Sequence, residues 1–417
     1  MIKKPGIACL ADALSLVDTH PFPNVTQLTV RPDKALGCRL RINVVAPTSL
    51  PRFDCAAMDG FAIKTSDAPE GTEVTLTVMQ TITAGLIGQT VYTGEAARIF
   101  TGARMPPGAD WVVMQEDARA QGAQVTLRRR AGGRAHIRPV GEDVCEEDVI
   151  LRAGTRLGPG EIALLTALGV TSVTVADAPR VAVISTGDEL AAAGQSLAPA
   201  QIHDTNRPML LQLLSGCGAA TTDLGICPDD PDRLLRILTD VAPDHDLVIS
   251  TGGASVGLAD HMSGLVARRG AVEFWRLQMR PGKPVGFGDI DDCPILVLPG
   301  NPVAALVDYT LIGRAILARL MGLPLPLAPA LGLPLGRAHS KPAGRTDVPL
   351  GRLELGPDGQ TRAMPLEKQG SANIAALARA EVLIVLTPDM TECEEGRIVE
   401  VVPIWDGIPR RAGRPNP

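Results

Sequence analysis

Hydrophobic and polar positions divide the chain into stretches with different periods. Residues 6–19 carry apolar side chains at helical spacing, which predicts an amphipathic helix rather than a signal peptide. Between residues 26 and 150, short alternating segments such as 74–78 are interrupted by Gly and Pro, a pattern typical of β-rich structure with many turns. Residues 160–169 predict another helix, and Gly169 fits its C-terminal cap.

A second pattern follows, in which apolar runs alternate with helical segments. The runs at 180–185, 246–250 and 294–298 predict β-strands that are buried on both faces. Helical spacing at 206–215 and from 303 to about 320 predicts helices after the first and third of these strands. Strands that alternate with helices indicate βαβ units and a parallel sheet.

The starts of these two helices carry capping signals. We expect Asn206 to act as the N-cap of the first helix, with Pro208 in its first turn. Asn301 can cap the second helix, which Pro302 begins, and the positive end of that helix would then be offered to a phosphate.

The predicted fold class is multidomain, combining α/β and β structure. A Pro- and Leu-rich stretch separates the α/β segment from a final set of short strands, which predicts a linker followed by a small β domain. The predicted parts are a β-rich N-terminal region at 1–176, an α/β domain at 177–322, a linker at 323–335, a β domain at 336–405 and a disordered tail at 406–417.

Composition excludes several classes of protein. A chain of 417 residues exceeds one ordinary core, and 45% hydrophobic with 21% charged residues is typical of a globular protein. The net charge of −6 gives no support for broad nucleic-acid binding, and no run of 18 apolar residues predicts a membrane span. The eight cysteines lack CxxC pairs and zinc-ligand spacing, so we expect a reducing, cytoplasmic location.

Three predicted strands end in polar loops that contain glycine, at 185–189, 250–257 and 299–302. Because the carboxyl ends of parallel strands lie on one edge of the sheet, and ligands bind at that edge, we expect these loops to form one site. Each loop alone has an ordinary structural explanation, such as a turn or a helix cap. Their recurrence at successive strand ends favours a binding site.

The residue types in these loops suit a phosphorylated ligand with Mg²⁺. Gly252 and Gly253 allow the backbone to approach a ligand closely and to direct amide N–H groups at it, and Ser255 adds a hydroxyl donor. Asp188 and Glu189 place carboxylates at the same edge, where Mg²⁺ commonly bridges protein and phosphate. The alternative for these two carboxylates is compensation of a helix dipole.

Further charged residues extend this interpretation. Arg276, Arg280 and Lys283 form a local cationic cluster in an acidic chain, and such groups suit phosphate and other oxyanions, although solvated surface is the alternative. Three more carboxylates in nearby loops can join the metal set: Asp229, Asp230 and Asp260. The six histidines form no cluster, and we interpret them as structural or exposed.

A series of short motifs follows in order along the chain, at 53–62, 98–103, 107–110, 113–116, 141–143, 185–190, 204–209, 252–257, 280–284, 298–303 and 369–371. Each motif alone has low specificity, but the whole series in order is highly specific. From about residue 6 to 404, the series resembles the MoeA and gephyrin E-domain family of molybdopterin molybdenumtransferases.

The resemblance implies a two-part N-terminal region, a central doubly wound α/β molybdopterin-binding domain and a C-terminal β-barrel-like domain. It implies a homodimer in which the N-terminal region of the partner completes each active cleft. The implied reaction uses Mg²⁺, molybdate and adenylyl-molybdopterin: the phosphoanhydride is hydrolysed, AMP leaves, and molybdenum is held by the dithiolene sulfurs. Implied partners are molybdopterin adenylyltransferase and molybdoenzymes or their chaperones, with no nucleic acid and no membrane.

The resemblance also implies roles for residues of this chain. The implied catalytic residues are Asp59, Thr101, Asp143, Asp188 and Glu189, the first three from the other subunit. The implied magnesium ligands are Asp188, Glu189, Asp229 and Asp260. The implied substrate-binding residues are Thr186, Gly187, Gly252, Gly253, Ser255, Gly257, Arg276, Arg280, Lys283, Pro299, Gly300, Asn301, Pro302 and Ser371.

The chain departs from the family pattern at several basic positions. Arg276 and Arg280 stand where relatives often carry Lys, which keeps the charge but changes the hydrogen-bonding geometry. Leu350 stands where the family usually has Arg, and Arg345 or Arg352 are the nearby replacements. Two other functions remain as alternatives, molybdopterin adenylyltransferase and a non-catalytic molybdopterin-binding scaffold. The intact acidic set favours an enzyme over a scaffold.

Overall fold

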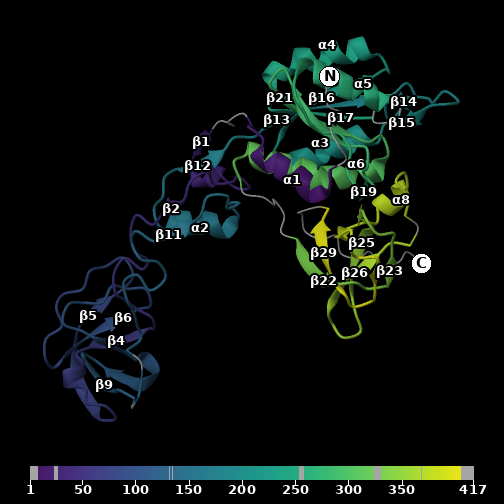
Figure 1. The fold of residues 1–417 in the computed structure, drawn as a ribbon. Coiled ribbons are helices and arrows are strands. Elements are labelled where there is room, and N and C mark those ends of the chain that lie inside the picture. Colours follow the sequence, from purple (N-terminus) through teal and green to yellow (C-terminus); the bar gives the residue numbers. More distant parts are fainter. Residues whose placement is uncertain are drawn as a thin grey trace. The chain divides into compact units, whose positions relative to one another are not determined.

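A computed structural model shows two compact units, Thr29–Val175 and a second unit made of Met1–Leu28 with Ala176–Pro417 (Figure 1). The structure describes residues 8–22, 27–130, 132–133, 135–252, 258–323, 330–367 and 369–404, without the side chains of 258–261. The predicted tail at 406–417 lies outside the described residues. Among the described helices, none has the length and apolar character that crossing a membrane requires.

The unit Thr29–Val175 contains a six-stranded sheet, as the alternating pattern predicts. In spatial order its strands are β7 (Trp111–Met114), β4 (Gly60–Ile63), β6 (Glu95–Ile99), β5 (Glu73–Ile82), β9 (Gln124–Arg128) and β8 (Ala118–Gln121). Only β5 and β6 run parallel; the other neighbours are antiparallel. Side chains of successive residues point to opposite faces, so Ala62 and Ile63 enter two different apolar clusters.

The rest of this unit is built around helix α2 (Pro159–Ala167). Glu161 accepts a hydrogen bond from the backbone N–H of Gly158 at 2.9 Å, which caps the helix start, and Gly169 has φ +71° just beyond the helix end, as predicted. Short paired strands accompany it: β1 (Gln27–Val30) with β12 (Val173–Ala176), β2 (Val44–Val45) with β11 (Val149–Leu151), and β3 (Cys55–Ala56) with β10 (Ile137–Arg138).

The second unit has a central six-stranded sheet. In spatial order its strands are β16 (Ala220–Cys227), β13 (Arg180–Thr186), β17 (Leu247–Thr251), β21 (Cys293–Leu298), β20 (Gly286–Ile290) and β18 (Val272–Phe274). The first four are parallel, and β20 and β18 continue the sheet in antiparallel pairing. The three strands predicted from apolar runs are β13, β17 and β21, and they are adjacent.

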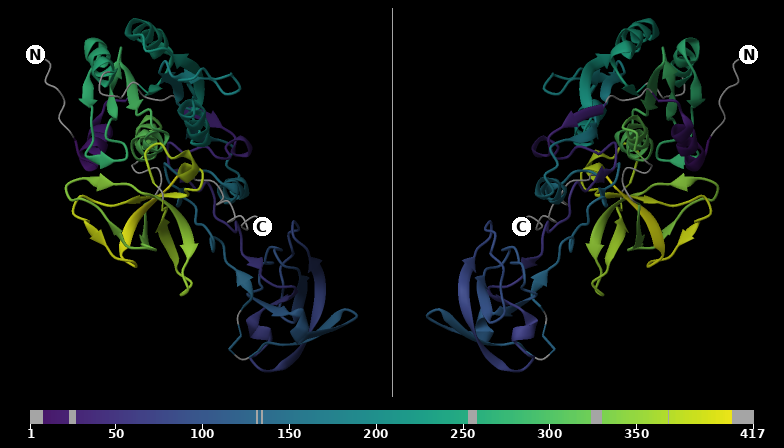
Figure 2. Two further views of the ribbon diagram at one scale, coloured as in Figure 1. Left: turned by 90° about the vertical axis from the view of Figure 1, so that its right-hand side faces the viewer. Right: turned by 90° about the vertical axis from the view of Figure 1, so that its left-hand side faces the viewer.

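Helices cover both faces of this sheet, which confirms the doubly wound α/β class (Figures 1 and 2). On β13, Val181 and Val183 enter one cluster while Ala182 and Ile184 enter the other. The first cluster includes side chains of α1 (Leu10–Thr19), α3 (Asn206–Gly216), α6 (Pro302–Asp308) and α7 (Arg314–Leu320). The second includes side chains of α4 (Pro231–Val241) and α5 (Leu258–Arg269).

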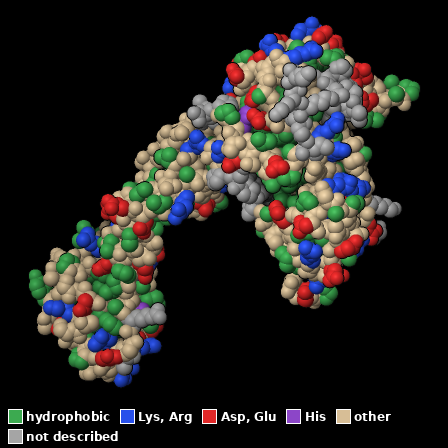
Figure 3. Space-filling model, in the orientation of Figure 1, with side chains coloured by type: hydrophobic (Ala, Val, Ile, Leu, Met, Phe, Trp, Pro, Cys, Tyr) green, Lys and Arg blue, Asp and Glu red, His purple; other side chains and the backbone are tan. Residues whose placement is uncertain are grey.

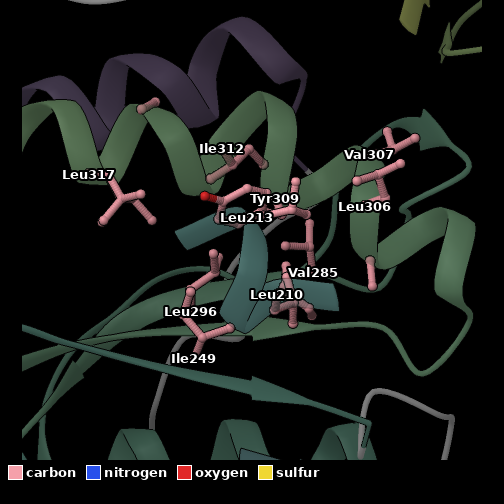
Figure 4. Close-up of a cluster of buried hydrophobic side chains, with 14 of the residues drawn as sticks. Leu210, Leu213, Ile249, Val285, Leu296, Leu306, Val307, Tyr309, Ile312 and Leu317 are labelled. Carbon is pink, nitrogen blue, oxygen red and sulfur yellow. The ribbon is translucent and has the colours of Figure 1, made fainter. Parts of the chain in front are cut away.

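The helix predicted from 303 to about 320 is continuous but changes its period. A π-helical turn, Tyr309–Gly313, connects α6 to α7. Tyr309 is fully buried between this turn, α3 and the sheet, close to Leu213 and Ile312 (Figure 4). Most side chains of this run are apolar and buried, although Asp308 and Arg314 are buried as well.

A C-terminal antiparallel sheet completes the second unit. Its strands, in spatial order, are β22 (Leu331–Pro334), β29 (Ile398–Pro403), β27 (Val382–Val385), β25 (Leu350–Leu355) and β26 (Thr361–Pro365). Shorter pairs are β23 (His339–Ser340) with β28 (Glu392–Cys393), β14 (Leu190–Ala191) with β15 (Ile202–His203), and β19 (Met279–Arg280) with β24 (Thr346–Asp347); α8 is Ile374–Leu377. Residues 331–334, predicted as linker, form β22 because they pair with β29 despite Pro334.

Candidate functional site

The carboxyl ends of the parallel strands meet at one edge, as the sequence predicts. The backbone N–H of Gly187, after β13, donates to the carbonyl of Cys227 at the end of β16, at 3.2 Å. The N–H of Gly252, after β17, donates to the carbonyl of Leu298 at the end of β21, also at 3.2 Å. A cavity of about 870 Å³ opens at this edge and is lined by residues from the loops after β13, β17 and β21.

Gly252 permits the close approach of two of these loops. Its φ of +92° is unfavourable for other residues, and a Cβ there would lie 2.2 Å from the carbonyl oxygen of Thr186. A Cβ on Gly300 would lie 3.7 Å from the Cα of Gly252, so the third loop is adjacent. The predicted binding residues Gly253, Ser255 and Gly257 lie outside the described residues.

The carboxylates after β13 and β16 form a group. The N–H of Asp229 donates to Oδ1 of Asp188 at 3.1 Å. Burial raises the pKa of Asp229, and the charges of Asp188 and Glu189 raise it further. Its buried Oδ1 has no hydrogen-bond partner in the described part of the chain. Carboxylate oxygens are ligands that Mg²⁺ prefers. Among the described residues, however, only His20, Glu273 and Asp289 bring three possible ligand atoms within 4.8 Å of one another, so Asp188, Glu189 and Asp229 do not form a closed ligand set in this structure. The side chain of Asp260 lies outside the described residues.

Asp188 and Glu189 face different cavities although they are neighbours in the sequence. Glu189 lines the 870 Å³ cavity together with Thr186. Asp188 lines a smaller cavity of about 470 Å³, next to Gly187 and Arg207. A metal held by both carboxylates would therefore lie at the border of these cavities.

The predicted cations divide between two adjoining cavities. Arg276 lines the 870 Å³ cavity, and Arg280 lines a second cavity of about 700 Å³. Lys283 lines both, together with Pro299 and Asn301. All three cations are exposed, which suits the binding of oxyanions from solution. On the face in Figure 3, positive and negative side chains are interspersed, so this grouping is local.

The segment between β22 and β25 supplies further cations to the second cavity. Arg337, Lys341 and Arg345 line it. Leu350 is buried, with its N–H donating to Oε1 of Gln369 at 2.7 Å. Of the two replacements considered from the sequence, Arg345 lines the cavity, while Arg352 is ion-paired with Glu354 and does not line it.

The remaining predicted binding residues also lie at this edge. Ser371 lines the second cavity, and its carbonyl accepts the N–H of Val303 at 3.1 Å. Pro299, Gly300, Asn301 and Pro302 line the first cavity. Asn301 occupies the N-cap position of α6, but its side chain makes no capping hydrogen bond, contrary to our expectation; only its carbonyl accepts the N–H of Ala305.

The capping prediction for Asn206 is wrong. Thr205 occupies the N-cap position of α3, and Asn206 is the first helical residue. The side-chain N–H groups of Asn206 instead donate to Thr251 Oγ1 at 2.8 Å and to the carbonyl of Gly300 at 2.8 Å. Acceptors in distant loops therefore replace the local backbone as its partners.

Three predicted residues belong to the unit Thr29–Val175. Oδ1 of Asp59 accepts hydrogen bonds from the backbone N–H and the hydroxyl of Thr101, both at 2.7 Å. These two bonds lower the pKa of the Asp59 carboxyl. Asp143 accepts a hydrogen bond from Arg138 at 2.6 Å. The structure thus brings Asp59 and Thr101 together and gives Asp143 a separate cationic partner.

The sequence analysis assigned no binding role to three residues that line the cavity. His203 lines it, and its Nδ1 lies 3.2 Å from the carbonyl of Ala192. Asp204 and Asn206 line it too, and both are buried. The motif at 204–209 was a signal for these residues, but their partners lie far away in the sequence.

Three family models match consecutive parts of the chain. The "MoeA N-terminal region (domain I and II)" matches residues 9–169, the "Probable molybdopterin binding domain" matches 182–319, and the "MoeA C-terminal region (domain IV)" matches 333–404. These matches follow the order of the motifs identified from the sequence.

Relatives match over nearly the full length. A molybdopterin molybdenumtransferase of Haemophilus influenzae is 33% identical over 93% of this chain and 96% of the relative. Molybdopterin molybdenumtransferase 2 of Mycobacterium tuberculosis is 36% identical over 91% of this chain and 95% of the relative. The crystal structure of a molybdopterin biosynthesis MoeA protein from Pyrococcus horikoshii OT3 aligns with a TM-score of 0.82 at 27% identity, over 95% of this chain and 100% of that one.

Proposed function

The chain belongs to the MoeA family of molybdopterin molybdenumtransferases, transferases of molybdenum cofactor biosynthesis, and on that premise we propose that it inserts molybdate into molybdopterin. The proposed reaction is the Mg²⁺-dependent hydrolysis of adenylyl-molybdopterin, with release of AMP and transfer of molybdenum to the dithiolene. The protein would act in the cytoplasm, between a molybdopterin adenylyltransferase and molybdoenzymes or their chaperones.

One observation carries this proposal: Lys283 lines two adjoining cavities, at the edge of the sheet where the loops with the carboxylates lie. The 870 Å³ cavity has the volume and the backbone-rich loops expected of a site for a phosphorylated pterin. The second cavity has five cationic side chains, and it suits molybdate. These five are Arg280, Lys283, Arg337, Lys341 and Arg345.

Asp188, Glu189 and Asp229 would hold Mg²⁺, with Asp260 as a further ligand. When bound, the ion offsets the negative charge of the pyrophosphate and polarises its oxygens. The unpartnered Oδ1 of Asp229 supports this assignment, since a buried carboxylate oxygen without a donor is costly unless a cation is bound.

The chain's own residues orient the substrate and the oxyanion. Arg276 and Lys283 would bind phosphate oxygens in the first cavity, and Arg280 would hold molybdate in the second. Water would attack one phosphorus of the phosphoanhydride, so that a new P–O bond forms and the bond from that phosphorus to the bridging oxygen breaks. AMP and the molybdopterin phosphate separate, and the protons of the water pass to solvent. Thr186, Gly252 and the 299–302 loop would contact the pterin and its phosphate.

We propose a homodimer in which the partner's N-terminal region supplies a second set of polar residues to the site. In this chain the set consists of two carboxylates and a hydroxyl: Asp59, Asp143 and Thr101. Its two hydrogen bonds from Thr101 keep Asp59 ionised and fixed in orientation, which suits a carboxylate that positions water or metal.

A turnover assay tests the proposal. Purified protein with adenylyl-molybdopterin, Mg²⁺ and molybdate should release AMP and incorporate molybdenum. Asp59→Asn and Glu189→Gln should both reduce AMP release at least tenfold, because each removes a carboxylate from the proposed reacting site. Glu354→Gln is the matched control, since this carboxylate pairs with Arg352 away from both cavities.

The outcomes separate the competing functions. A wild type that binds molybdopterin but releases no AMP with any oxyanion contradicts the insertase and favours a scaffold. A wild type that instead forms adenylyl-molybdopterin from ATP and molybdopterin favours the adenylyltransferase.

A further inference from the structure

We propose that Asn206 is a positioning residue that fixes the end of β17 and the loop after β21 against each other and thereby shapes the 870 Å³ cavity. The identity of the ligand rests on the proposed function, but the positioning role rests on hydrogen bonds between described residues. No role for Asn206 follows from its position at the start of α3.

The side chain of Asn206 joins three segments. Its Nδ2 donates to Thr251 Oγ1 at 2.8 Å at the end of β17, and to the carbonyls of Gly300 at 2.8 Å and Pro299 at 3.4 Å after β21. The hydroxyl of Thr251 also donates to the Pro299 carbonyl, at 3.2 Å. One amide group therefore connects the start of α3 to the end of β17 and to the loop after β21.

The chemistry of these acceptors requires a donor at residue 206. The carbonyl oxygens of Pro299 and Gly300 can only accept, so they fix which end of the Asn206 amide faces them. A carboxylate in the same place would repel both oxygens. An alanine would remove the side-chain donor of the Gly300 carbonyl, while the Pro299 carbonyl would keep the hydroxyl of Thr251.

The hydrogen bonds of the Asn206 side chain go to other segments and not to its own helix. Fold stability alone does not explain this placement of the side chain. Its side chain is buried, and its Oδ1 has no hydrogen-bond partner in the described residues. An unpartnered buried acceptor lowers stability. Retaining an amide at such a cost is consistent with a requirement of the site.

The turn that precedes Asn206 is hydrogen-bonded to the segment that carries Glu189. Arg207 donates to Asp204 at 2.9 Å and so fixes the turn before α3. The N–H of Asp204 donates to the carbonyl of Ala191 at 2.9 Å, and the N–H of Ile202 donates to the carbonyl of Glu189 at 2.8 Å. Asn206 therefore holds the end of β17 and the loop after β21 in a fixed relation to the loop after β13.

Two variants test this inference. Asn206→Ala should raise the KM for adenylyl-molybdopterin about tenfold and lower kcat less than threefold, because the loops that bind the substrate lose their fixed spacing while the reacting groups remain. At high pH, Asn206→Asp should have a higher KM than Asn206→Ala, because its carboxylate faces two carbonyls. As the pH falls, the protonated acid can donate one hydrogen bond. The KM of the Asp variant should then fall below the KM of the Ala variant.

Amide hydrogen exchange supplies a measurement that needs no ligand. The N–H of Gly252, bonded to Leu298, and the N–H of Val303, bonded to Ser371, should exchange at least tenfold faster in Asn206→Ala. Amides within β13 should exchange at the wild-type rate, which excludes general unfolding. Gln80→Glu is the matched control: Nε2 of Gln80 donates to the carbonyl of Gln89 at 2.7 Å in the other compact unit.

Either of two results overturns the inference. The first is unchanged exchange at Gly252 and Val303 in Asn206→Ala. The second is an Asn206→Asp variant whose KM, or whose affinity for molybdopterin, equals that of Asn206→Ala at every pH. A wild type that releases no AMP contradicts the proposed function instead, and the exchange experiment still decides whether Asn206 positions the loops.

Discussion

The carboxyl group of Asp308 lies directly against the backbone of Gly282. A Cβ built on Gly282 would be 2.0 Å from Oδ1 of Asp308, so only glycine fits there, and its φ of +101° also favours glycine. Gly282 belongs to the loop between Arg280 and Lys283, two of the cations that line the second cavity. A fully buried carboxyl on α6 thus packs directly behind the loop that presents the oxyanion-binding side chains.

This carboxyl should make stability depend on pH. Complete burial raises the pKa of Asp308 well above its usual value, and neither oxygen has a hydrogen-bond partner in the described residues. A raised folded-state pKa means that the stabilising contribution is complete below the unfolded pKa near 3.8 and is lost as pH rises toward the folded pKa. Asp308→Asn should remove this dependence, which for one proton has a slope of about 1.4 kcal/mol per pH unit.

Thermal unfolding between pH 5 and pH 8 checks this prediction. The variant should gain stability relative to the wild type as pH rises. Parallel curves for the two proteins would contradict it, and they would mean that Asp308 is ionised in the folded state.

His20 should stabilise the attachment of α1 in a pH-dependent way. Its Nε2 lies 3.1 Å from Asp289 and its Nδ1 lies 3.6 Å from Glu273. Burial alone would lower the pKa of His20, but the hydrogen bond and charge of Asp289, together with Glu273, outweigh burial and raise it. Carboxylates on opposite ring nitrogens suit an imidazolium better than a metal ion, which would take both carboxylates beside one nitrogen.

The sign of this effect follows from the raised pKa. The stabilisation is complete below the unfolded pKa of 6.5 and is lost as pH rises through the folded value. His20→Gln should cost about 1.5–3 kcal/mol at pH 6 and less at pH 9. Unfolding curves of the wild type and the variant at both pH values check this, and an equal loss at the two pH values would show that His20 is neutral.

Removing one carboxylate from the proposed metal site should have opposite effects with and without the ion. Asp229→Asn removes repulsion from Asp188 and Glu189, so the variant should unfold at a higher temperature than the wild type in EDTA. With Mg²⁺ at a hundred times its Kd, the wild type should gain about 2.7 kcal/mol and the variant much less. Equal Mg²⁺ stabilisation of both proteins would remove Asp229 from the ligand set.

The two arginines near Leu350 should differ in function. Arg345 lines the second cavity, although it also donates to Asp347 at 2.9 Å, whereas Arg352 is paired with Glu354 outside it. Arg345→Ala should raise the molybdate concentration needed for half-maximal AMP release at least tenfold, a loss of about 1.5–3 kcal/mol for a charged contact. Arg352→Ala is the matched control and should leave that concentration unchanged; a similar effect of both variants would contradict the assignment.

The sequence by itself determined which loops end the central strands and what chemistry they carry. Apolar runs identify β13, β17 and β21, and the glycine at 252 indicates a close backbone approach at the end of β17. That the approach is to the carbonyl of Thr186 comes from the structure. The cations at 276, 280 and 283 are close in sequence, so their grouping was also predictable. These features depend on local spacing, which sequence patterns record directly.

Tertiary structure decided the choices that depend on residues far apart in the chain. Asn206 has the local signal of an N-cap, but Thr251 and Gly300 provide its acceptors. The same kind of long-range contact places His20 between Glu273 and Asp289, and selects Arg345 over Arg352 for the second cavity. The physical reason is that a side chain's hydrogen bonds and burial depend on which strands become neighbours in the sheets, and periodicity along the chain does not encode that order.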